Sequence, residues 1–224
     1  YSFEITKKGL ILKKELSPRN NIYLSLLISS ALNIFSLVKH ELTSEFEYIS
    51  YKSLLCYMPG NSIVKLMRKK PESYGTAKDK INRLADELNI DINRHEISHI
   101  SDKNLQEKGL DLVAWIPFED KIPNLIIILG QCACGKNWDK KQYETGRYEN
   151  YFNFYKQKPI HALFVPYALT NEYNSFYQSD DIVSDRIIFD RKRILEYLHD
   201  ADFFESLNTK QVVERCISFE EDII

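Results

Sequence analysis

The sequence predicts an α/β fold in which helices flank a central mixed β-sheet. Two neighbouring apolar runs, at 110–118 and 124–134, predict adjacent strands. The second run is apolar on both faces, which is typical of a central strand. Two further apolar runs, at 160–169 and 185–190, alternate with helical patterns. This alternation of strands and helices is the pattern of a layered α/β domain.

The composition is that of an ordinary globular protein, with 44% hydrophobic and 28% charged residues in a chain of 224. The formal net charge of -2 gives no global basic field, but a local basic patch is sufficient for binding nucleic acid. No apolar run reaches the roughly 18 residues of a membrane span, so we expect no membrane insertion. The four cysteines do not form the framework of a secreted protein, and we expect free thiols and a cytoplasmic location.

The N-terminal segment predicts a hairpin followed by a helix. The stretch "YSFEITKKGLILKK" indicates a short edge hairpin, and Pro18 opens a helix with an apolar face. Because the chain starts at Tyr1 rather than Met, we expect it to be cut from a longer protein. We therefore divide it into residues 1–43, which pack on a missing upstream domain, and residues 44–224, the main domain.

Two more helices are predicted before the first central strand. The second helix of the chain begins at Ser44 as its N-cap, and Glu47 three residues later completes a capping box. The amphipathic spacing of apolar residues at 76–90 predicts the third. Both helices are expected to pack on the sheet.

Two segments between these helices and the strands predict surface connections. Residues 61–75 contain the basic run "KLMRKK" (65–70) and are punctuated by Pro and Gly. Residues 91–108 are polar and predict a long loop that carries His95 and His99. The basic run either contacts a DNA backbone or is simply solvated.

The C-terminal third predicts helices on either side of the last two strands. Residues 137–155 are mostly helical in pattern, with Asn137 as the N-cap, and residues 191–207 predict a helix capped by Asp190. The order is therefore helices, two adjacent strands, helix, strand, strand and helix, which predicts a mixed sheet.

Polar side chains interrupt the two central strands. Asp111 is an ionisable residue in an apolar strand, where burial of a lone carboxylate is costly without a partner or a cation. Gln131 offers an amide oxygen at the end of the second strand. Strand alternation puts Asp111 on the face of Val113 and Gln131 on the face of Leu129. If the strands pair as a hairpin, both oxygens converge on one hard divalent cation such as Mg²⁺.

The segments "GLDLVAW" and "LIIILGQCACGKNW" resemble the two motif strands of the PD-(D/E)xK nuclease superfamily, which has the restriction-endonuclease-like fold. The resemblance covers residues 44–200 and implies a central mixed sheet flanked by helices. It implies that Asp111 and Gln131 are catalytic and bind the metal, and that Glu47 on the preceding helix is a further metal ligand. The second segment also resembles segments of bacterial anti-phage defence proteins.

Two positions depart from the pattern of the superfamily. Gln131 stands where an acid is usual, and as a neutral group it binds a cation less strongly. Ala133 stands where the lysine is expected. Lys136 is the nearest replacement, and Lys140 and Lys141 on the following helix are alternatives, since a long flexible stem lets the ammonium group reach the site from a shifted position.

The resemblance implies a deoxyribonuclease that hydrolyses phosphodiester bonds with Mg²⁺ or Mn²⁺. It implies double-stranded DNA as the substrate, by analogy, and other domains or subunits of a bacterial anti-phage defence complex as partners. Lys136 would orient the attacking water or offset charge in the transition state. The alternative is a catalytically silent nuclease-like module that binds nucleic acid or a partner protein, which the missing lysine at position 133 favours.

Other chemistries fit the segment "GQCACGK" less well. Zinc needs four ligands, and no second cysteine pair or nearby histidine pair accompanies Cys132 and Cys134. A nucleophilic cysteine needs an adjacent base, for which His161 is the only obvious candidate. A phosphate-binding loop needs Ser or Thr where Asn137 stands. We expect both cysteines, which face away from Gln131, to act as small buried hydrophobes.

Overall fold

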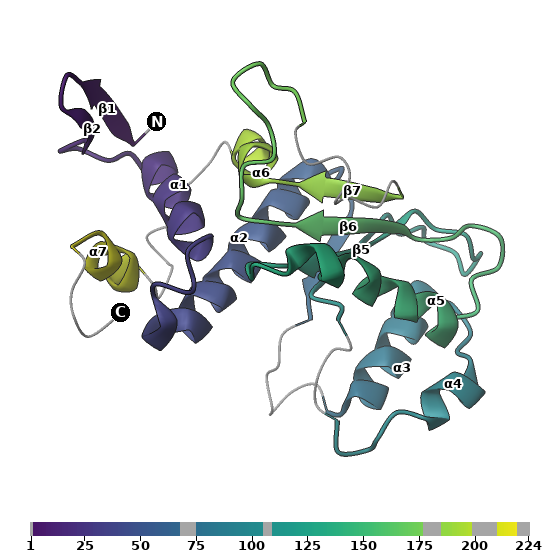
Figure 1. Cartoon of the computed structure of the whole chain (residues 1–224). Helices are drawn as coiled ribbons and strands as arrows, with labels where there is room; N and C mark the ends of the chain where they lie inside the picture. The colour runs from purple at the N-terminus through teal and green to yellow at the C-terminus, as the bar shows by residue number, and fades with distance from the viewer. Residues whose placement is uncertain (1, 68–74, 105–108, 177–184, 199–209, 219–224) are drawn as a thin grey trace.

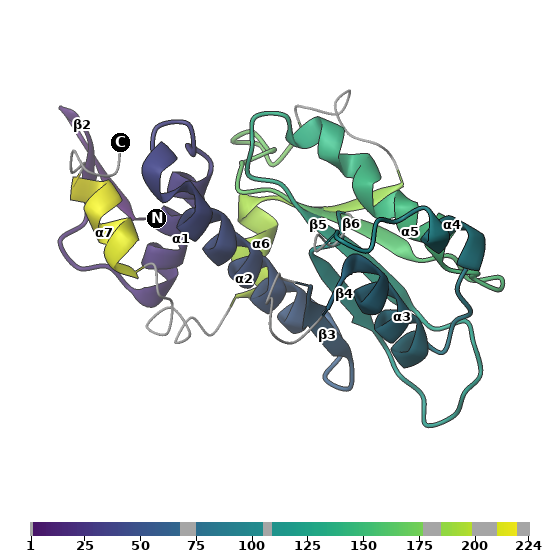
Figure 2. The ribbon, with the colours of Figure 1, turned by 90° about the horizontal axis from the view of Figure 1, so that it is seen from below.

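The fold is built on a five-stranded mixed β-sheet that lies between two layers of helices (Figure 1, Figure 2). The computed structural model describes residues 2–67, 75–104, 109–176, 185–198 and 210–218. The strands, in spatial order, are β3 (Ile63–Leu66), β4 (Leu112–Trp115), β5 (Ile127–Cys132), β6 (Ile160–Phe164) and β7 (Arg186–Phe189).

The type of strand pairing changes once across the sheet, at β5. β3, β4 and β5 form an antiparallel meander, whereas β5, β6 and β7 run parallel to one another. Parallel neighbours need crossover connections, and the crossover from β5 to β6 carries the helices η2 (Trp138–Arg147, a 3-10 helix) and α5 (Tyr148–Tyr151). The carboxyl ends of β5, β6 and β7 therefore lie at the same edge of the sheet.

The other elements surround this sheet. The first part of the chain is a separate two-stranded hairpin beside α1 (Figure 1). The remaining elements are β1 (Phe3–Thr6), β2 (Gly9–Leu12), α1 (Pro18–Ser29), η1 (Ser36–Val38), α2 (Lys39–Tyr57), α3 (Ala77–Leu88), α4 (Arg94–Ser98), α6 (Arg191–Tyr197) and α7 (Lys210–Ser218).

Helices α2 and α6 cover one face of the sheet, α1 packs on both of these helices, and α7 packs on α1 farther from the strands (Figure 2). The fully buried α2 residues Leu42, Phe46 and Ile49 share a core with alternate residues of the strands, among them Leu112 and Ile128. Each such side chain contributes about 1.5–3 kcal/mol through burial. This face is called the α2 side below.

The opposite face is covered by α3, α4, α5 and η2, and Figure 2 shows the sheet between the two layers. Here Val113 and Leu129 pack with Ile81 of α3 and Tyr148 of α5. Trp138 at the start of η2 packs on Leu163 of β6. This face is called the α3 side below.

Most of the predicted elements are confirmed. The N-terminal hairpin, the helix that begins at Pro18, the helix over 77–88 and the central strands all form. Ser17 and Thr76 cap α1 and α3 with reciprocal side-chain and backbone hydrogen bonds. The mixed sheet flanked by helices is present, and Asp190 caps α6 as predicted.

Several local predictions are wrong. Residues 63–66 form an edge strand rather than a loop, because "IVKL" pairs with β4. Helix α2 begins at Lys39, so Ser44 and Glu47 lie inside the helix and form no capping box. The division after residue 43 thus falls within α2. The segment 91–108 contains the short helix α4, capped by Asn93.

Two more predictions concern caps and segments near the C-terminus. Asn137 makes no capping hydrogen bond to η2. The predicted helix over 191–207 ends at Tyr197 in the structure, and residues 199–207 lie outside the described part of the chain, as do residues 68–70 of the basic run. Across the described residues, no helix combines the length and the apolar character that crossing a membrane requires.

Candidate nuclease site at the carboxyl end of β5

A β-bulge at Asp111 opens strand β4. Leu112 pairs with Gly130 in the register of β4 and β5, and the backbone N–H of Asp111 also donates to the carbonyl oxygen of Gly130 at 3.0 Å. Two successive residues therefore oppose one, which defines a bulge. The core supports this: Leu110 is buried on the α3 side and Leu112 on the α2 side, although regular alternation would turn both the same way.

Gly130 makes room for the bulge. A Cβ atom at this position would lie 3.0 Å from the Cβ of Leu112 and 3.2 Å from a ring carbon of Phe164. Both distances are too short for a larger side chain without movement of the neighbours. The close approach of β4 to β5 thus depends on glycine at this position.

The Asp111 carboxylate lies at the carboxyl end of β5 and close to α2. Its Oδ2 accepts a hydrogen bond of 2.7 Å from the backbone N–H of Cys132. Burial raises the pKa of the Cys132 thiol well above its usual value, and the carboxylates of Asp111 and then Glu47 raise it further. The pKa of Cys134 is also raised, first by burial and then by Glu47 and Asp111. The two carboxylates, from separate elements, therefore lie within electrostatic range of the same two thiols.

Gln131 lies on the other side of the sheet. It pairs with Leu163 in the register of β5 and β6, and Leu163 packs with Trp138 on the α3 side. Its side chain is only 4% exposed, and its Nε2 donates to the carbonyl oxygen of Cys132 at 3.3 Å. The Oε1 atom is buried without a hydrogen-bond partner among the described residues.

The prediction that Asp111 and Gln131 share a face is therefore wrong. Strand alternation was applied across a bulge, and the extra residue moves Asp111 from the α3 side to the α2 side. On the α2 side, the side chains at the end of β5 and just beyond it that the two carboxylates act on are those of Cys132 and Cys134. Of the predicted metal ligands, Asp111 and Glu47 both act on the Cys132 and Cys134 thiols, whereas Gln131 lies on the other side of the sheet.

Lysine side chains lie near this acidic pair. Lys136 lines a pocket of about 210 Å³ together with Lys39, Cys134 and Tyr167. The ammonium groups of Lys141 and Lys39 lower the pKa of Cys134, which shows that both charges reach the same place. Lys140 is exposed and does not line the pocket. Lys39 was missed by the sequence analysis, although it lies on the same helix as Glu47.

The cysteines are not activated as nucleophiles. Both thiols have raised pKa values, so little thiolate is present at neutral pH. His161 is committed elsewhere: its ring contacts the Thr145 hydroxyl and a Glu149 carboxylate oxygen, each at 2.9 Å, on the α3 side. All four cysteines are free, as predicted.

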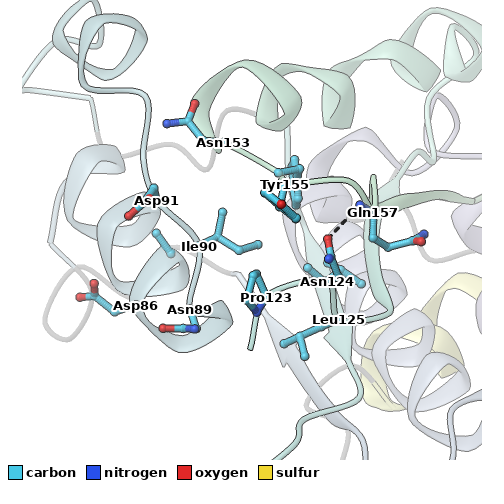
Figure 3. Close-up of a pocket in the computed structure, with 13 residues that line it drawn as sticks. Asp86, Asn89, Ile90, Asp91, Pro123, Asn124, Leu125, Asn153, Tyr155 and Gln157 are labelled. Carbon is cyan, nitrogen blue, oxygen red and sulfur yellow. Dashed lines mark hydrogen bonds between the residues drawn. The ribbon is translucent and has the colours of Figure 1, made fainter. Parts of the chain in front are cut away.

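The pocket in Figure 3 lies at the opposite end of β5. It measures about 450 Å³ and is lined by residues that follow α3, including Asp91, and by residues around Asn124 and Gln157. The backbone N–H of Gln157 donates to Asn124 Oδ1 at 3.0 Å, the dashed line in Figure 3. Among the described residues that line it, none is Lys, Arg or His. A phosphate would find no cationic partner there, so we assign the candidate site to the carboxyl end of β5.

The donor atoms at the site suit a hard divalent cation in part. Within the described ranges, no three His, Cys, Asp or Glu residues are grouped as a metal site. Asp111 and Glu47 provide two carboxylates, and Mg²⁺ commonly binds through one or two carboxylates, with water and substrate phosphate as its other ligands. The pair therefore fits a cation that is held jointly by protein and substrate.

Comparisons with known proteins identify no relative of this chain. No family model matches the sequence, and neither the curated proteins nor the solved structures include a significant match.

Proposed function

We propose that the chain is a metal-dependent deoxyribonuclease domain with a restriction-endonuclease-like core. The observation that carries the proposal is the hydrogen bond from the Cys132 N–H to the Asp111 carboxylate at the carboxyl end of β5, where Glu47 of α2 also acts on the Cys132 thiol. The order of α2, β3, α3, α4, β4 and β5, followed by a helical crossover and the parallel strand β6, gives the mixed sheet flanked by helices that the proposal requires.

Asp111 and Glu47 would hold Mg²⁺ or Mn²⁺. A bound cation would offset the cost of holding ionised carboxylates in a partly buried place. When bound, the metal ion supplies charge neutralisation at the scissile phosphate and lowers the pKa of a coordinated water. Gln131 is left out of this ligand set because its side chain lies on the α3 side.

Lysine side chains would supply the positive charge that the reaction needs. Phosphodiester hydrolysis builds negative charge on the phosphate oxygens, and cationic groups fixed nearby stabilise it. Lys136 and Lys39 line the neighbouring pocket, and Lys141 acts on Cys134 from η2. Lys136 remains our first candidate, with Lys39 and Lys141 as the alternatives.

The biological setting rests on the sequence resemblance. We propose double-stranded DNA as the substrate and a role as effector of a bacterial anti-phage defence system, together with other domains or subunits. Asp111 and Glu47 are the residues on which this activity depends.

A catalytically silent nucleic-acid-binding module is the second candidate. The observation that favours it is the pair of cysteines on the α2 side of β5, next to the two carboxylates. A thiol with a raised pKa supplies neither a third oxygen ligand nor an ammonium group. The lysines of the neighbouring pocket would then serve binding alone.

Plasmid cleavage separates the two candidates. Supercoiled DNA is incubated with the protein in Mg²⁺, in Mn²⁺ and in EDTA. The nuclease predicts nicking that needs the metal and falls by about a hundredfold or more in Asp111→Asn and in Glu47→Gln. Glu149→Gln, which removes a carboxylate on the α3 side, serves as the matched control and keeps full activity.

Two outcomes would overturn the nuclease. Cleavage that persists at the wild-type rate in Asp111→Asn would show that this carboxylate is not needed. DNA binding without cleavage in either metal would favour the silent module. A loss of activity in Lys136→Ala would identify its catalytic cation, whereas retained activity would transfer the role to Lys39 or Lys141.

A further inference from the structure

A larger pocket lies at the carboxyl ends of β6 and β7. It measures about 700 Å³, and the described residues that line it include Arg19, Arg191 and Lys192 and one acid, Glu172. Tyr23 of α1 forms part of the same wall. In Figure 1 the arrowheads of β6 and β7 point to the side on which α1 and α6 lie, which is where these residues come from. The pocket therefore has an excess of positive charge.

The three cations are positioned by neutral groups. Arg191 donates from Nε to the carbonyl oxygen of Pro166 at 2.8 Å, and its guanidinium lies over the Tyr23 ring at 5.6 Å. Arg19 donates to the carbonyl oxygen of Leu195 at 3.1 Å. Lys192 donates to the side-chain oxygen of Asn174 at 2.5 Å.

None of these contacts neutralises charge. The ion pairs among described residues do not include Arg19, Arg191 or Lys192. Cations that are held in place and left without a carboxylate attract anions, and a concave wall strengthens the local potential. An anionic ligand is the chemistry that this pocket fits.

Arg191 connects the wall of the cationic pocket to the smaller pocket beside the candidate nuclease site. The smaller pocket beside Cys134, with Lys39 and Lys136, also has Ser30 and Tyr167 in its wall. Arg191 bonds to both of these residues: its side chain donates to the Ser30 hydroxyl at 3.3 Å, and its backbone N–H donates to the Tyr167 carbonyl at 2.9 Å. The Tyr167 hydroxyl in turn donates to the carbonyl oxygen of Cys134 at 2.6 Å.

Basic residues thus follow one another along the carboxyl ends of the three parallel strands. Asp111 and Glu47 lie at β5, then Lys39 and Lys136 beyond its end, then the larger pocket at β6 and β7. A single phosphate would occupy one of these positions. A chain of phosphodiesters, with a charge at every nucleotide, matches cations in series.

We propose that the DNA strand cut at Asp111 and Glu47 continues across Lys39 and Lys136 into the pocket of Arg19, Arg191 and Lys192, where its phosphates bind. The proposal rests on the proposed function, because it takes the acidic pair as the cleavage point. Arg191 also supports the wall through its bonds to Pro166 and Ser30, so Arg19 and Lys192 are the residues to test.

Binding in the absence of cleavage tests the proposal. The affinity of the whole chain for a fluorescent DNA duplex is measured by anisotropy in EDTA, over a series of salt concentrations. The variant Arg19→Ala/Lys192→Ala is compared with the control Lys121→Ala/Lys156→Ala, which removes two exposed lysines near the opposite end of β5. Thermal unfolding curves establish that both variants are folded.

The path predicts that Arg19→Ala/Lys192→Ala binds about tenfold or more weakly at low salt, with a salt slope lower by about two, one for each lost phosphate contact. The control binds like the wild type. Equal affinity and slope in the wild type and Arg19→Ala/Lys192→Ala would overturn the path, as would a wild type that binds no DNA. Displacement of the duplex by millimolar inorganic phosphate at constant ionic strength would assign the pocket to a free anion and overturn it too.

The binding result is independent of the cleavage result. Weakened binding by Arg19→Ala/Lys192→Ala together with metal-dependent cleavage supports both the path and the nuclease. Weakened binding without cleavage in any metal supports the path as a DNA-binding groove and rejects the nuclease. Unchanged binding with cleavage rejects the path alone.

Discussion

Asp111 is the residue on which the candidate site depends, and its direction is set by one extra residue in a strand. Without the bulge, alternation would point its carboxylate to the α3 side, where Val113 and Leu129 are buried. With the bulge, the carboxylate accepts a hydrogen bond from the backbone N–H of Cys132 and acts on the Cys132 thiol, as Glu47 does. Bulges are common next to active sites because they re-aim a side chain in this way.

The sequence could predict which residues matter here but not how they point. An ionisable residue in an apolar strand marked Asp111, and the helix before the sheet marked Glu47. The bulge leaves no such mark, because it depends on hydrogen bonds between Asp111, Leu112 and Gly130 on two strands. Because strand alternation without the bulge puts Gln131 and Asp111 on the same face, Gln131 was assigned to the site.

The reactivity of Cys132 tests the position of Asp111. The negative charge of Asp111 contributes to the raised pKa of this thiol, so Asp111→Asn lowers the pKa. More thiolate is then present at mildly alkaline pH, and alkylation by iodoacetamide is expected to be severalfold faster. The rate is followed by mass spectrometry of the modified peptide in a Cys56→Ser background, because Cys56 is exposed.

The matched control is Glu149→Gln, a carboxylate on the α3 side, which leaves the alkylation rate of Cys132 unchanged. An equal rate in the wild type and Asp111→Asn would mean that the two groups do not interact.

Among the elements, long or strongly patterned ones were predictable and short ones were not. The amphipathic helix α3 and the apolar strands β5 and β6 follow from periodicity. Strand β3 is four residues long and contains Lys65, so its sequence is like that of a loop. It forms because β4 offers a free edge and because Lys65 binds Glu87 at 2.5 Å. The start of α2 was missed because no side chain caps it.

The crossover from β5 to β6 is fixed by a polar cluster on the α3 side. Glu149 of α5 bonds to Lys158 at 2.8 Å and to His161 of β6 at 2.9 Å. The hydrogen bond from Lys158 lowers the pKa of Glu149 below its usual value of 4.5, and His161 adds to this effect. A carboxyl group with a depressed pKa stabilises the fold when it is ionised.

Acid should therefore weaken this connection. The contribution of Glu149 is fully present above the unfolded-state pKa of 4.5 and is lost as pH falls through the lower folded-state pKa. We expect Glu149→Gln to lower the free energy of unfolding by about 1 kcal/mol at neutral pH, and by less in acid. Urea unfolding at a series of pH values measures this difference. A difference that stays constant with pH, or one that Glu119→Gln at an exposed position reproduces, would contradict it.

For the whole molecule, the sheet order brings the chemical groups to one edge. Three parallel strands end at the same side, so Lys136, Tyr167 and Arg191, which follow β5, β6 and β7, lie at one edge of the sheet. Helices α1 and α2 add Arg19, Lys39 and Glu47 from the N-terminal part of the chain. These helices share one core with the sheet, so α1 and the candidate site are physically linked.

The fold class followed from the sequence, whereas the basic surface did not. Apolar runs and helical periods are local signals, and they were sufficient for a mixed sheet flanked by helices. Arg19, Lys39 and Arg191 are far apart in the chain and meet only through α1, α2 and the strand ends. No local pattern distinguishes them from solvated surface cations.

Titration calorimetry with Mn²⁺ measures whether Asp111 and Glu47 share a divalent cation. We expect saturable binding by the wild type and by Glu149→Gln, and affinity weaker by about tenfold or more in Asp111→Asn and in Glu47→Gln. Equal Mn²⁺ affinity in all four proteins, or no binding by the wild type, would contradict this expectation.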